Sequence, residues 1–249
     1  NLNQAPGSLT WSRDGKSLCF SMSVPAKKKP FAKMPAKPKG AKWAEPPTVI
    51  TRMNYRRDGA GYLPLAHTHL FVISSEGGTP RQLTHGDFDH GGPYGWAKKD
   101  SAIIFSANRH ADHEYDPLNS EIYSITVADR KITPLTDRQG PDTHPVVSPG
   151  GEQIAYLGHD ENHLGYQQNH LYLMGIDGKN PTHWLLIDEL DRSISSPQWI
   201  HANELVFKYD DMGVTKLART NMGGTYRVIA ENVGGTSLGR PYGGGSYSV

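Results

Sequence analysis

The sequence predicts an all-β fold, a β-propeller of four-stranded antiparallel blades, and three observations lead to it. One phrase recurs four times, with an aromatic residue or valine, a polar turn and an apolar strand ending in Phe or Tyr, at residues 11–20, 96–105, 147–156 and 199–207. Each phrase is followed by two further strand signals around a tight turn. Helical periodicity is almost absent. Four strand signals repeated about every fifty residues are typical of propeller blades.

The phrases place the blades along the chain. Their last aromatic residues stand at 20, 105, 156 and 207, so that the second and third intervals are both 51 residues, and an insertion at residues 25–62 lengthens the first. We expect a single propeller domain with blades at about 9–84, 94–136, 145–187 and 197–230. A fifth unit begins at 240–249, so we expect about four blades plus the start of a fifth, as a fragment of a larger ring.

Strand chemistry supports each blade in turn. Asp-Gly and Gly-Gly pairs supply the positive φ angles of tight hairpins, and β-branched and aromatic residues fill the strands between them. The third and fourth strands are expected at 69–73 and 81–84, 121–125 and 132–136, 170–174 and 183–186, and 215–219 and 226–229. The recurring aromatic residues are then interpreted as the packing layer between blades.

The connections between strands differ in length. Those between the first and second and between the third and fourth strands of a blade are tight, whereas longer polar connections cover 22–68, 107–120, 158–169 and 209–214, with inter-blade loops such as 85–95. In an up-and-down blade these two kinds lie on opposite faces. Binding and catalytic residues concentrate on loops held by a rigid scaffold, so the face with the long connections is the predicted functional face.

Composition narrows the function classes. Lys and Arg number 26 against 25 Asp and Glu, a net charge of +1, so neither nucleic acid nor an anionic membrane is an expected partner. Apolar runs are far shorter than the roughly 20 residues that a membrane helix needs. We expect a soluble protein, with the cytoplasm and the periplasm both open as compartments. Cys19 lies in an apolar strand and is interpreted as a buried hydrophobic residue.

Basic residues mark two segments of the insertion. Seven lysines alternate with prolines between residues 25 and 42, which favours a solvated, extended segment over a nucleic-acid arm. Further along, Arg56 and Arg57 precede Asp58. Paired arginines can hold a carboxylate in a fork, and an ion pair at the base of the loop is the structural alternative.

Histidine pairs and one serine motif are the other candidate chemical sites. The pairs His67/His69, His85/His90 and His110/His113 stand near acidic residues but lack a metal-ligand spacing, so we predict neither a metal site nor a cofactor. Ser237 stands in a G-x-S-x-G pattern at 235–239. The required helix and the later Asp and His do not follow it, so Ser237 is interpreted as a residue of an inter-blade loop and no catalytic residue is predicted.

Several segments resemble one enzyme family. Residues 41–50 with 55–59, 68–72 with 77–84, and 105–109 with 118–123 are similar to the propeller of prolyl oligopeptidase-family serine peptidases, in the branch of acylaminoacyl peptidases and dipeptidyl aminopeptidases. Residues 135–138, 148–151 and 190–193 extend the similarity over nearly the whole chain. The segment at 55–59 is its most specific part.

The resemblance implies a function for a longer protein. In that family the propeller covers a C-terminal α/β-hydrolase domain, which holds Ser, Asp and His, and it restricts entry to short or unfolded peptides. We therefore expect a non-catalytic, gating and substrate-selecting propeller, whose partners are that hydrolase domain and a peptide substrate. Arg56, Arg57 and Arg109 are the candidate residues for binding a peptide carboxylate or carbonyl.

Two other readings stay open from the sequence. A stand-alone propeller acting as a protein-interaction scaffold has no attached enzyme, and a polysaccharide-binding or lyase propeller needs aromatic and His residues that converge at the central pore. Open blade edges also raise self-association as an expectation.

Overall fold

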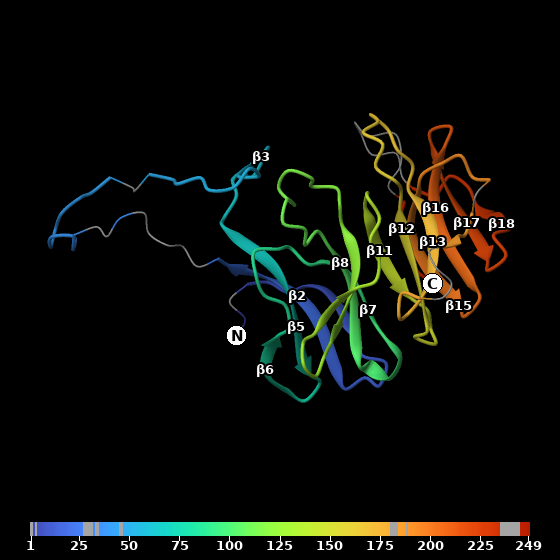
Figure 1. Ribbon diagram of the computed structural model, residues 1–249, viewed down its shortest axis with the longest axis horizontal. Helices are drawn as coiled ribbons and strands as arrows, with labels where there is room; N and C mark the ends of the chain where they lie inside the picture. Colours follow the sequence, from blue (N-terminus) through green and yellow to red (C-terminus); the bar gives the residue numbers. More distant parts are fainter. Residues whose placement is uncertain are drawn as a thin grey trace.

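The computed structural model describes residues 2, 4–26, 32, 35–44, 47–179, 184–187, 189–234 and 245–249, which fold into four successive four-stranded antiparallel sheets (Figure 1). Blade 1 comprises β1 (Gly7–Trp11), β2 (Ser17–Pro25), β5 (Ala66–Ser74) and β6 (Gly77–Gln82). Blade 2 comprises β7 (Gly91–Trp96), β8 (Ala102–Ala107), β9 (Glu121–Thr126) and β10 (Ile132–Pro134). Blade 3 comprises β11 (Asp142–Val147), β12 (Gln153–Gly158), β13 (His170–Gly175) and β14 (Trp184–Leu185). Blade 4 comprises β15 (Ile194–His201), β16 (Glu204–Asp211), β17 (Val214–Asn221) and β18 (Tyr226–Ala230).

Only short elements stand outside the blades in the described part of the chain. A hairpin of β3 (Arg56–Arg57) and β4 (Gly61–Tyr62) lies within the insertion between β2 and β5, and a 3-10 turn, η1 (Lys98–Asp100), joins β7 to β8. The described residues of the insertion at 35–44 and 47–54 extend away from the body of the molecule (Figure 1). The all-β prediction is therefore confirmed. Among the described residues no helix has the length and apolar character needed to cross a membrane.

Neighbouring blades pack face to face, and each contact involves the first strand of the later blade. β7 lies against β1 and β2, β11 against β7, β8 and β9, and β15 against β11, β12 and β13. We call the face that a blade turns toward the preceding blade its leading face, and the opposite one its trailing face. The blades therefore form an ordered arc, from blade 1 to blade 4, in which each leading face meets a trailing face (Figure 1).

Aromatic residues at one repeated position fill the leading faces. Phe105 stacks on its cross-strand partner Tyr123 with ring centroids 5.6 Å apart, and Tyr156 stacks on Tyr172 at 5.4 Å. Phe207 occupies the same position in β16 and is fully buried. Rings buried in this way contribute more than their area alone, because stacked aromatic pairs add about 0.5–1.5 kcal/mol.

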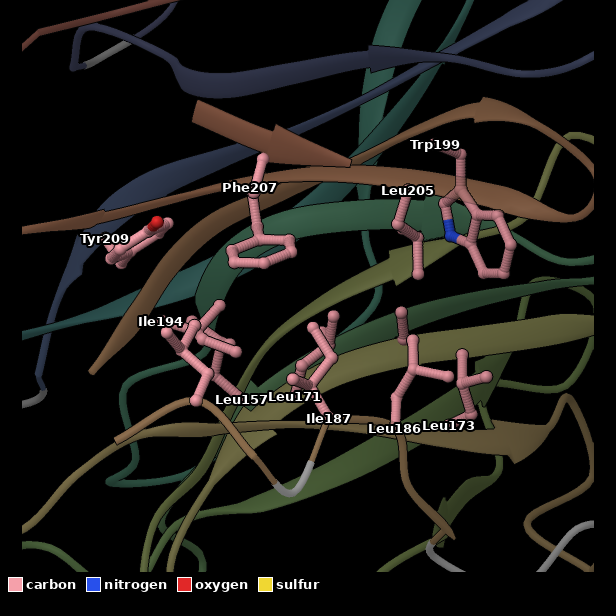
Figure 2. Packing of buried hydrophobic residues seen from close by; sticks show 13 residues of the cluster. Leu157, Leu171, Leu173, Leu186, Ile187, Ile194, Trp199, Leu205, Phe207 and Tyr209 are labelled. Atoms are coloured by element: carbon pink, nitrogen blue, oxygen red, sulfur yellow. The ribbon is translucent and has the colours of Figure 1, made fainter. Parts of the chain in front are cut away.

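The interface of blades 3 and 4 shows how these residues meet. Phe207, Leu205 and Trp199 of blade 4 point toward aliphatic residues of blade 3, among them Leu157 and Leu171 (Figure 2). The indole of Trp199 also donates a hydrogen bond to the backbone oxygen of Val146, at 3.0 Å. The phrase that recurs in the sequence thus builds the interface between blades.

Arg13, in the turn from β1 to β2, joins three blades at the face opposite the long connections. Its Nε donates to the backbone oxygen of Trp96 at 3.0 Å, and its Nη2 donates to the backbone oxygen of Ser148 at 2.7 Å. Its Nη1 donates to the backbone oxygen of Pro149. One side chain of blade 1 therefore holds the ends of first strands in blades 2 and 3.

Two expectations need correction. The connection at 209–214 is not a long loop, because β16 and β17 pair as far as Asp211 and Val214, leaving the two-residue turn Met212–Gly213 with φ of 50° and 81°. Both central residues have the positive φ that the right-handed twist of a two-residue hairpin requires. Trp11 also differs from the other phrase residues, since its side chain is exposed.

Candidate functional site

The long connections gather at one end of the blades, which we call the loop face. They are the connections β2–β5, β6–β7, β8–β9, β10–β11, β12–β13 and β14–β15. Hydrogen bonds anchor some of these connections: the backbone N–H of Thr68, in β5, donates to Asp89 Oδ1 at 2.6 Å, and that of Asn169 donates to Ser193 Oγ at 3.1 Å. These bonds tie the β6–β7 connection to blade 1 and join the β12–β13 and β14–β15 connections to each other.

Arg109 is a half-buried cation on the loop face, at the start of the β8–β9 connection. Its Nη1 lies 2.6 Å from His90 Nε2, and its guanidinium carbon lies 4.8 Å from the ring centroid of Phe88. Burial lowers the pKa of the guanidinium, which still remains charged. No ion pair joins Arg109 to a carboxylate among the residues described. The site therefore offers a partly desolvated positive charge with unused N–H donors.

Histidines form a neutral layer under Arg109. His90 Nδ1 lies 3.0 Å from the backbone oxygen of Thr68 and must donate to it, which leaves Nε2 to accept from Arg109. His69 Nδ1 lies 3.1 Å from Thr84 Oγ1. Burial, the largest cause, lowers the pKa of both His69 and His90 to about 4. Both imidazoles are therefore uncharged near neutral pH, and His90, which accepts from Arg109, orients the guanidinium without adding a charge.

Two histidine pairs that are separate in the sequence, His67/His69 and His85/His90, lie next to each other in the structure. The ring of His69 lies 5.2 Å from that of His90 and 6.4 Å from that of His85, and His67 Nδ1 lies 4.0 Å from Asp89 Oδ1. Within the described ranges, no three His, Cys, Asp or Glu side chains are arranged to hold a metal ion. Of these side chains, His90 is the one that contacts Arg109.

A second polar centre, between blades 2 and 3, is built on two buried carboxyl groups. Thr136 Oγ1 donates to Glu121 Oε2, and His110 Nε2 lies 3.7 Å from Glu121 Oε1. Arg138 Nε donates to Asp142 Oδ1 at 3.0 Å. Burial raises the pKa of Glu121 to about 7 and that of Asp142 to about 6, the latter against the opposing effect of Arg138. Glu121 therefore changes its charge close to neutral pH.

Arg138 extends this centre toward a polar pocket on blade 3. Its Nη1 donates to Asp160 Oδ1 and lies 3.0 Å from the hydroxyl of Tyr172, and its guanidinium lies 4.1 Å from the Tyr172 ring centroid. Asp160 and Tyr172 both line a pocket of about 440 Å³. The other lining residues are His159, Asn162, Leu164, Tyr166, Gln167, Gln168, His170 and Asp191.

The structure separates two of the predicted arginines from the third. Arg56 and Arg57 are exposed on β3, paired with Tyr62 and Gly61 of β4. Neither makes an ion pair with another described residue, so the structure does not show the alternative of an ion pair with Asp58. No contact brings either of them to Arg109 within the described part of the chain. Arg109 alone lies in a built polar environment.

Cys19 and Ser237 are the remaining residues singled out in the sequence. Cys19 is fully buried between blades 1 and 2, and burial raises the pKa of its thiol to about 12, so it is an unreactive core residue. Ser237 lies outside the described residues.

Sequence reasoning missed the Glu121 centre. One signal for it was present in the sequence. His69 in blade 1 and Glu121 in blade 2 hold the same position in the third strand, directly before Leu70 and Ile122. Each is followed fifteen residues later by a threonine, Thr84 or Thr136. In both blades that threonine bonds to the side chain and to the next backbone N–H, that of Leu70 or Ile122.

Comparison with known families places the chain. Residues 10–163, more than half of the chain, match the family described as the dipeptidyl peptidase IV (DPP IV) N-terminal region. The chain belongs to this family. It is therefore a propeller domain related to those of prolyl oligopeptidase-family peptidases, as the sequence predicted. No curated protein matches the chain.

Solved structures support the same fold. An acylaminoacyl peptidase in complex with Z-Gly-Gly-Phe-chloromethyl ketone superposes with a TM-score of 0.64 at 16% identity, over 92% of this chain and 32% of that one. Uncomplexed acylaminoacyl peptidase from Pyrococcus horikoshii gives 0.63 at 15% identity, with the same coverage of 92% and 32%. TolB from Acinetobacter baumannii gives 0.53 at 16% identity, over 91% of this chain and 42% of that one.

These likenesses confirm the β-propeller fold of four-stranded blades. The chain spans about a third of the length of the acylaminoacyl peptidases and less than half of the TolB chain.

Proposed function

We propose that this propeller acts as the gating and substrate-selecting domain of a serine peptidase that cleaves short peptides, with catalysis carried out by an α/β-hydrolase domain that the 249 residues do not include. Membership of the dipeptidyl peptidase IV N-terminal family supports this role, and so does the similarity to acylaminoacyl peptidases. One of those acylaminoacyl peptidases was solved in complex with a peptide derivative, Z-Gly-Gly-Phe-chloromethyl ketone. The contribution of this chain is then to admit and orient the peptide.

Arg109 is the observation that carries the proposal. The guanidinium of Arg109 is half buried without a carboxylate partner, so it is already partly desolvated before a ligand binds. A carboxylate that binds to it can accept two parallel N–H hydrogen bonds, which compensates for that desolvation. His90 accepts from Nη1 and Phe88 lies beside the cation, so the fork is held in one orientation. A peptide carboxylate, or a strongly polarised peptide carbonyl, has the matching chemistry.

Arg56 and Arg57 have a secondary role in the proposal. They are exposed and lack ion-pair partners among the described residues, so they act as a solvated positive region that attracts acidic peptides. Exposed charges change association rates more than affinity, and salt weakens their effect.

Peptide binding to the chain tests the role of Arg109. Isothermal titration would compare N-acetylated dipeptides that end in a free carboxylate with the same peptides ending in a carboxamide. We expect the acid to bind about tenfold more tightly than the amide, and Arg109→Gln to remove that preference, because a hydrogen bond to a charged group contributes roughly 1.5–3 kcal/mol.

Arg130→Gln is the matched control, because Arg130 is an exposed arginine in the tight β9–β10 turn, away from the loop face. If Arg109→Gln keeps the preference for the free acid, Arg109 is not the carboxylate site. If neither peptide binds while the chain captures a folded protein partner, the scaffold function replaces the peptidase function.

A further inference from the structure

The pocket of about 440 Å³ on blade 3 is a second feature of the loop face, and Arg109 is not among its lining residues. Its walls come from the β12–β13 connection, from the start of β13 and from Asp191 in the β14–β15 connection. The two connections meet where Gln168 Nε2 donates to Asp191 Oδ1 at 2.5 Å. Blade 3 packs against blade 2 on one side and blade 4 on the other, so the pocket lies inside the arc.

A buried glutamate holds one wall of this pocket in place. The Glu161 side chain is 6% exposed, and its Oε1 accepts from the backbone N–H of His163 at 2.5 Å and from Gln167 Nε2 at 2.7 Å. Its Oε2 is buried and has no hydrogen-bond partner among the described residues. The hydrogen bond from His163, the largest cause, lowers the pKa of this carboxyl, so it is charged at neutral pH. A negative charge therefore lies directly behind the lining residue Gln167.

The two aspartates of the lining are incompletely neutralised. Arg138 donates to Asp160 but also to the buried Asp142, so that one cation serves two carboxylates. Arg192 Nη1 lies 3.6 Å from Asp191 Oδ2, which is beyond hydrogen-bond distance. The side chains of Asp160 and Asp191 are 75% and 87% exposed, so both carboxylates are accessible. The pocket therefore attracts positive charge.

The unused hydrogen-bonding atoms of the lining include several oxygens. Asn162 Nδ2 already donates to the backbone oxygen of Asp160, as Gln168 Nε2 does to Asp191. Within the described part of the chain, Asp160 Oδ2, Asn162 Oδ1 and Gln168 Oε1 accept no hydrogen bond. A ligand that satisfies these oxygens supplies N–H donors, and a charged donor makes the stronger bonds.

Leu164 and Tyr166 give the same pocket an apolar wall. Both line it, and their side chains are 64% and 68% exposed. Lysine and arginine side chains bury an apolar stem while their charged end stays near polar atoms, and the face of an aromatic ring also attracts a cation. The α-amino group of a peptide has no such stem. An apolar wall beside two carboxylates therefore matches a basic side chain.

We propose that this pocket binds a lysine or arginine side chain of the peptide, with Asp160 and Asp191 at its charged end and Leu164 and Tyr166 along its stem. The inference rests on the proposed function, because it takes the ligand to be a peptide substrate. It adds a preference for peptides with a basic residue to the preference for a carboxylate at Arg109.

Nuclear magnetic resonance titration with Nα-acetyl-lysine N-methylamide tests the pocket by itself. This compound has a basic side chain but neither a free α-amine nor a carboxylate, so its binding does not depend on Arg109. We expect the side-chain amide resonances of Asn162, Gln167 and Gln168 to shift and saturate together, and the arginine compound to behave alike. The norleucine compound keeps the stem without the charge and should bind about tenfold more weakly.

Asp191→Asn is the sharpest variant, because its amide oxygen still accepts from Gln168 and the charge alone is lost. We expect it to weaken binding of the lysine compound about threefold, and the double variant Asp160→Asn, Asp191→Asn about tenfold, with the norleucine compound unaffected. Asp177→Asn is the matched control, since Asp177 is an exposed aspartate in the β13–β14 connection, away from the loop face. Leu164→Ser should weaken the lysine and norleucine compounds equally.

Three results would overturn the proposal. Equal affinities for the lysine and norleucine compounds would remove the role of charge. Unchanged binding by the double variant would place the cation elsewhere. If glycine N-methylamide, which has a free α-amine and no side chain, shifts the same resonances at the same affinity as the lysine compound, the pocket takes a peptide N-terminus instead.

These outcomes are separate from the test of the proposed function, in which Arg109→Gln is compared on dipeptide acids and amides without a basic residue. If the acid preference depends on Arg109 and the lysine compound does not bind, the basic-side-chain pocket alone is wrong. If the lysine compound binds and the acid preference is absent, the pocket stands and the role of Arg109 fails.

Discussion

The charge of Glu121 makes the stability of the propeller depend on pH near neutrality. The pKa of this carboxyl is about 7 in the folded chain, because burial disfavours its charged form, against an ordinary value of 4.5. A carboxyl whose pKa is raised by folding binds its proton more tightly in the folded state. The stabilisation of the fold by this bound proton is complete below pH 4.5, and it is lost as the pH rises from 4.5 to about 7.

The size of the effect follows from that difference. Each pKa unit corresponds to about 1.4 kcal/mol, so an ideal shift of this size would give about 3.4 kcal/mol. Glu121 lies close to the polar loop face and next to His110, where water and partner charges screen it, so we expect roughly 1–3 kcal/mol. Asp142, whose pKa of about 6 is also raised by burial, adds a change of the same sign at lower pH.

Glu121→Gln tests this reasoning. The amide keeps the shape and can accept from Thr136, but it carries no charge at any pH. Urea unfolding measured from pH 4 to pH 8.5 should show little difference at pH 4, and a variant more stable than the unchanged chain by roughly 1–3 kcal/mol at pH 8. Glu76→Gln, at an exposed position in the β5–β6 turn, is the control and should leave the profile unchanged. Parallel profiles for Glu121→Gln and the unchanged chain would refute a raised pKa at this residue.

Three other predictions concern the contacts between blades and the activity of the chain. Arg13→Ala should lower the free energy of unfolding by roughly 1–3 kcal/mol, because the hydrogen bonds of Arg13 hold blades 2 and 3. Lys16→Ala, in the same turn, should change the free energy of unfolding little. Equal effects of the two substitutions in chemical denaturation would contradict the role of Arg13. Phe207→Ala should lower the free energy of unfolding by roughly 3–5 kcal/mol in the same assay, because it leaves a cavity in the interface of Figure 2. A decrease of less than about 1 kcal/mol would mean that the interface rearranges to fill the cavity. The chain alone should not hydrolyse aminoacyl or peptidyl nitroanilides, and turnover that Ser237→Ala abolishes would show otherwise.

Local patterns explain why the fold could be predicted from the sequence. The phrase from Trp96 to Phe105 combines a turn with an alternating apolar strand, and both properties depend on neighbouring residues alone. The exposure of Trp11 could not be predicted in this way. It depends on which blade lies next to it, and no local pattern contains that information.

The candidate site was predicted only in part, for a related reason. Arg109 was singled out, but its fork is oriented by His90 and Phe88 from another connection, and the sequence does not show that the two loops meet. Arg56 and Arg57 have the same guanidinium group, but they lie exposed on the β3–β4 hairpin and not beside His90 and Phe88. Glu121 went unnoticed because a glutamate next to a polar loop is ordinarily exposed, and its burial depends on how blades 2 and 3 pack.

Nuclear magnetic resonance of the chain, titrated with an N-acetylated dipeptide acid, tests the central claim most directly. If the loop face handles peptides, the side-chain Nε–H resonance of Arg109 and the amide resonances of Phe88 and His90 shift together and saturate at one affinity, while those of the opposite turns, such as Asp14 and Arg130, stay in place. Shifts confined to those turns or to the β3–β4 hairpin, with Arg109 unmoved, would contradict the account.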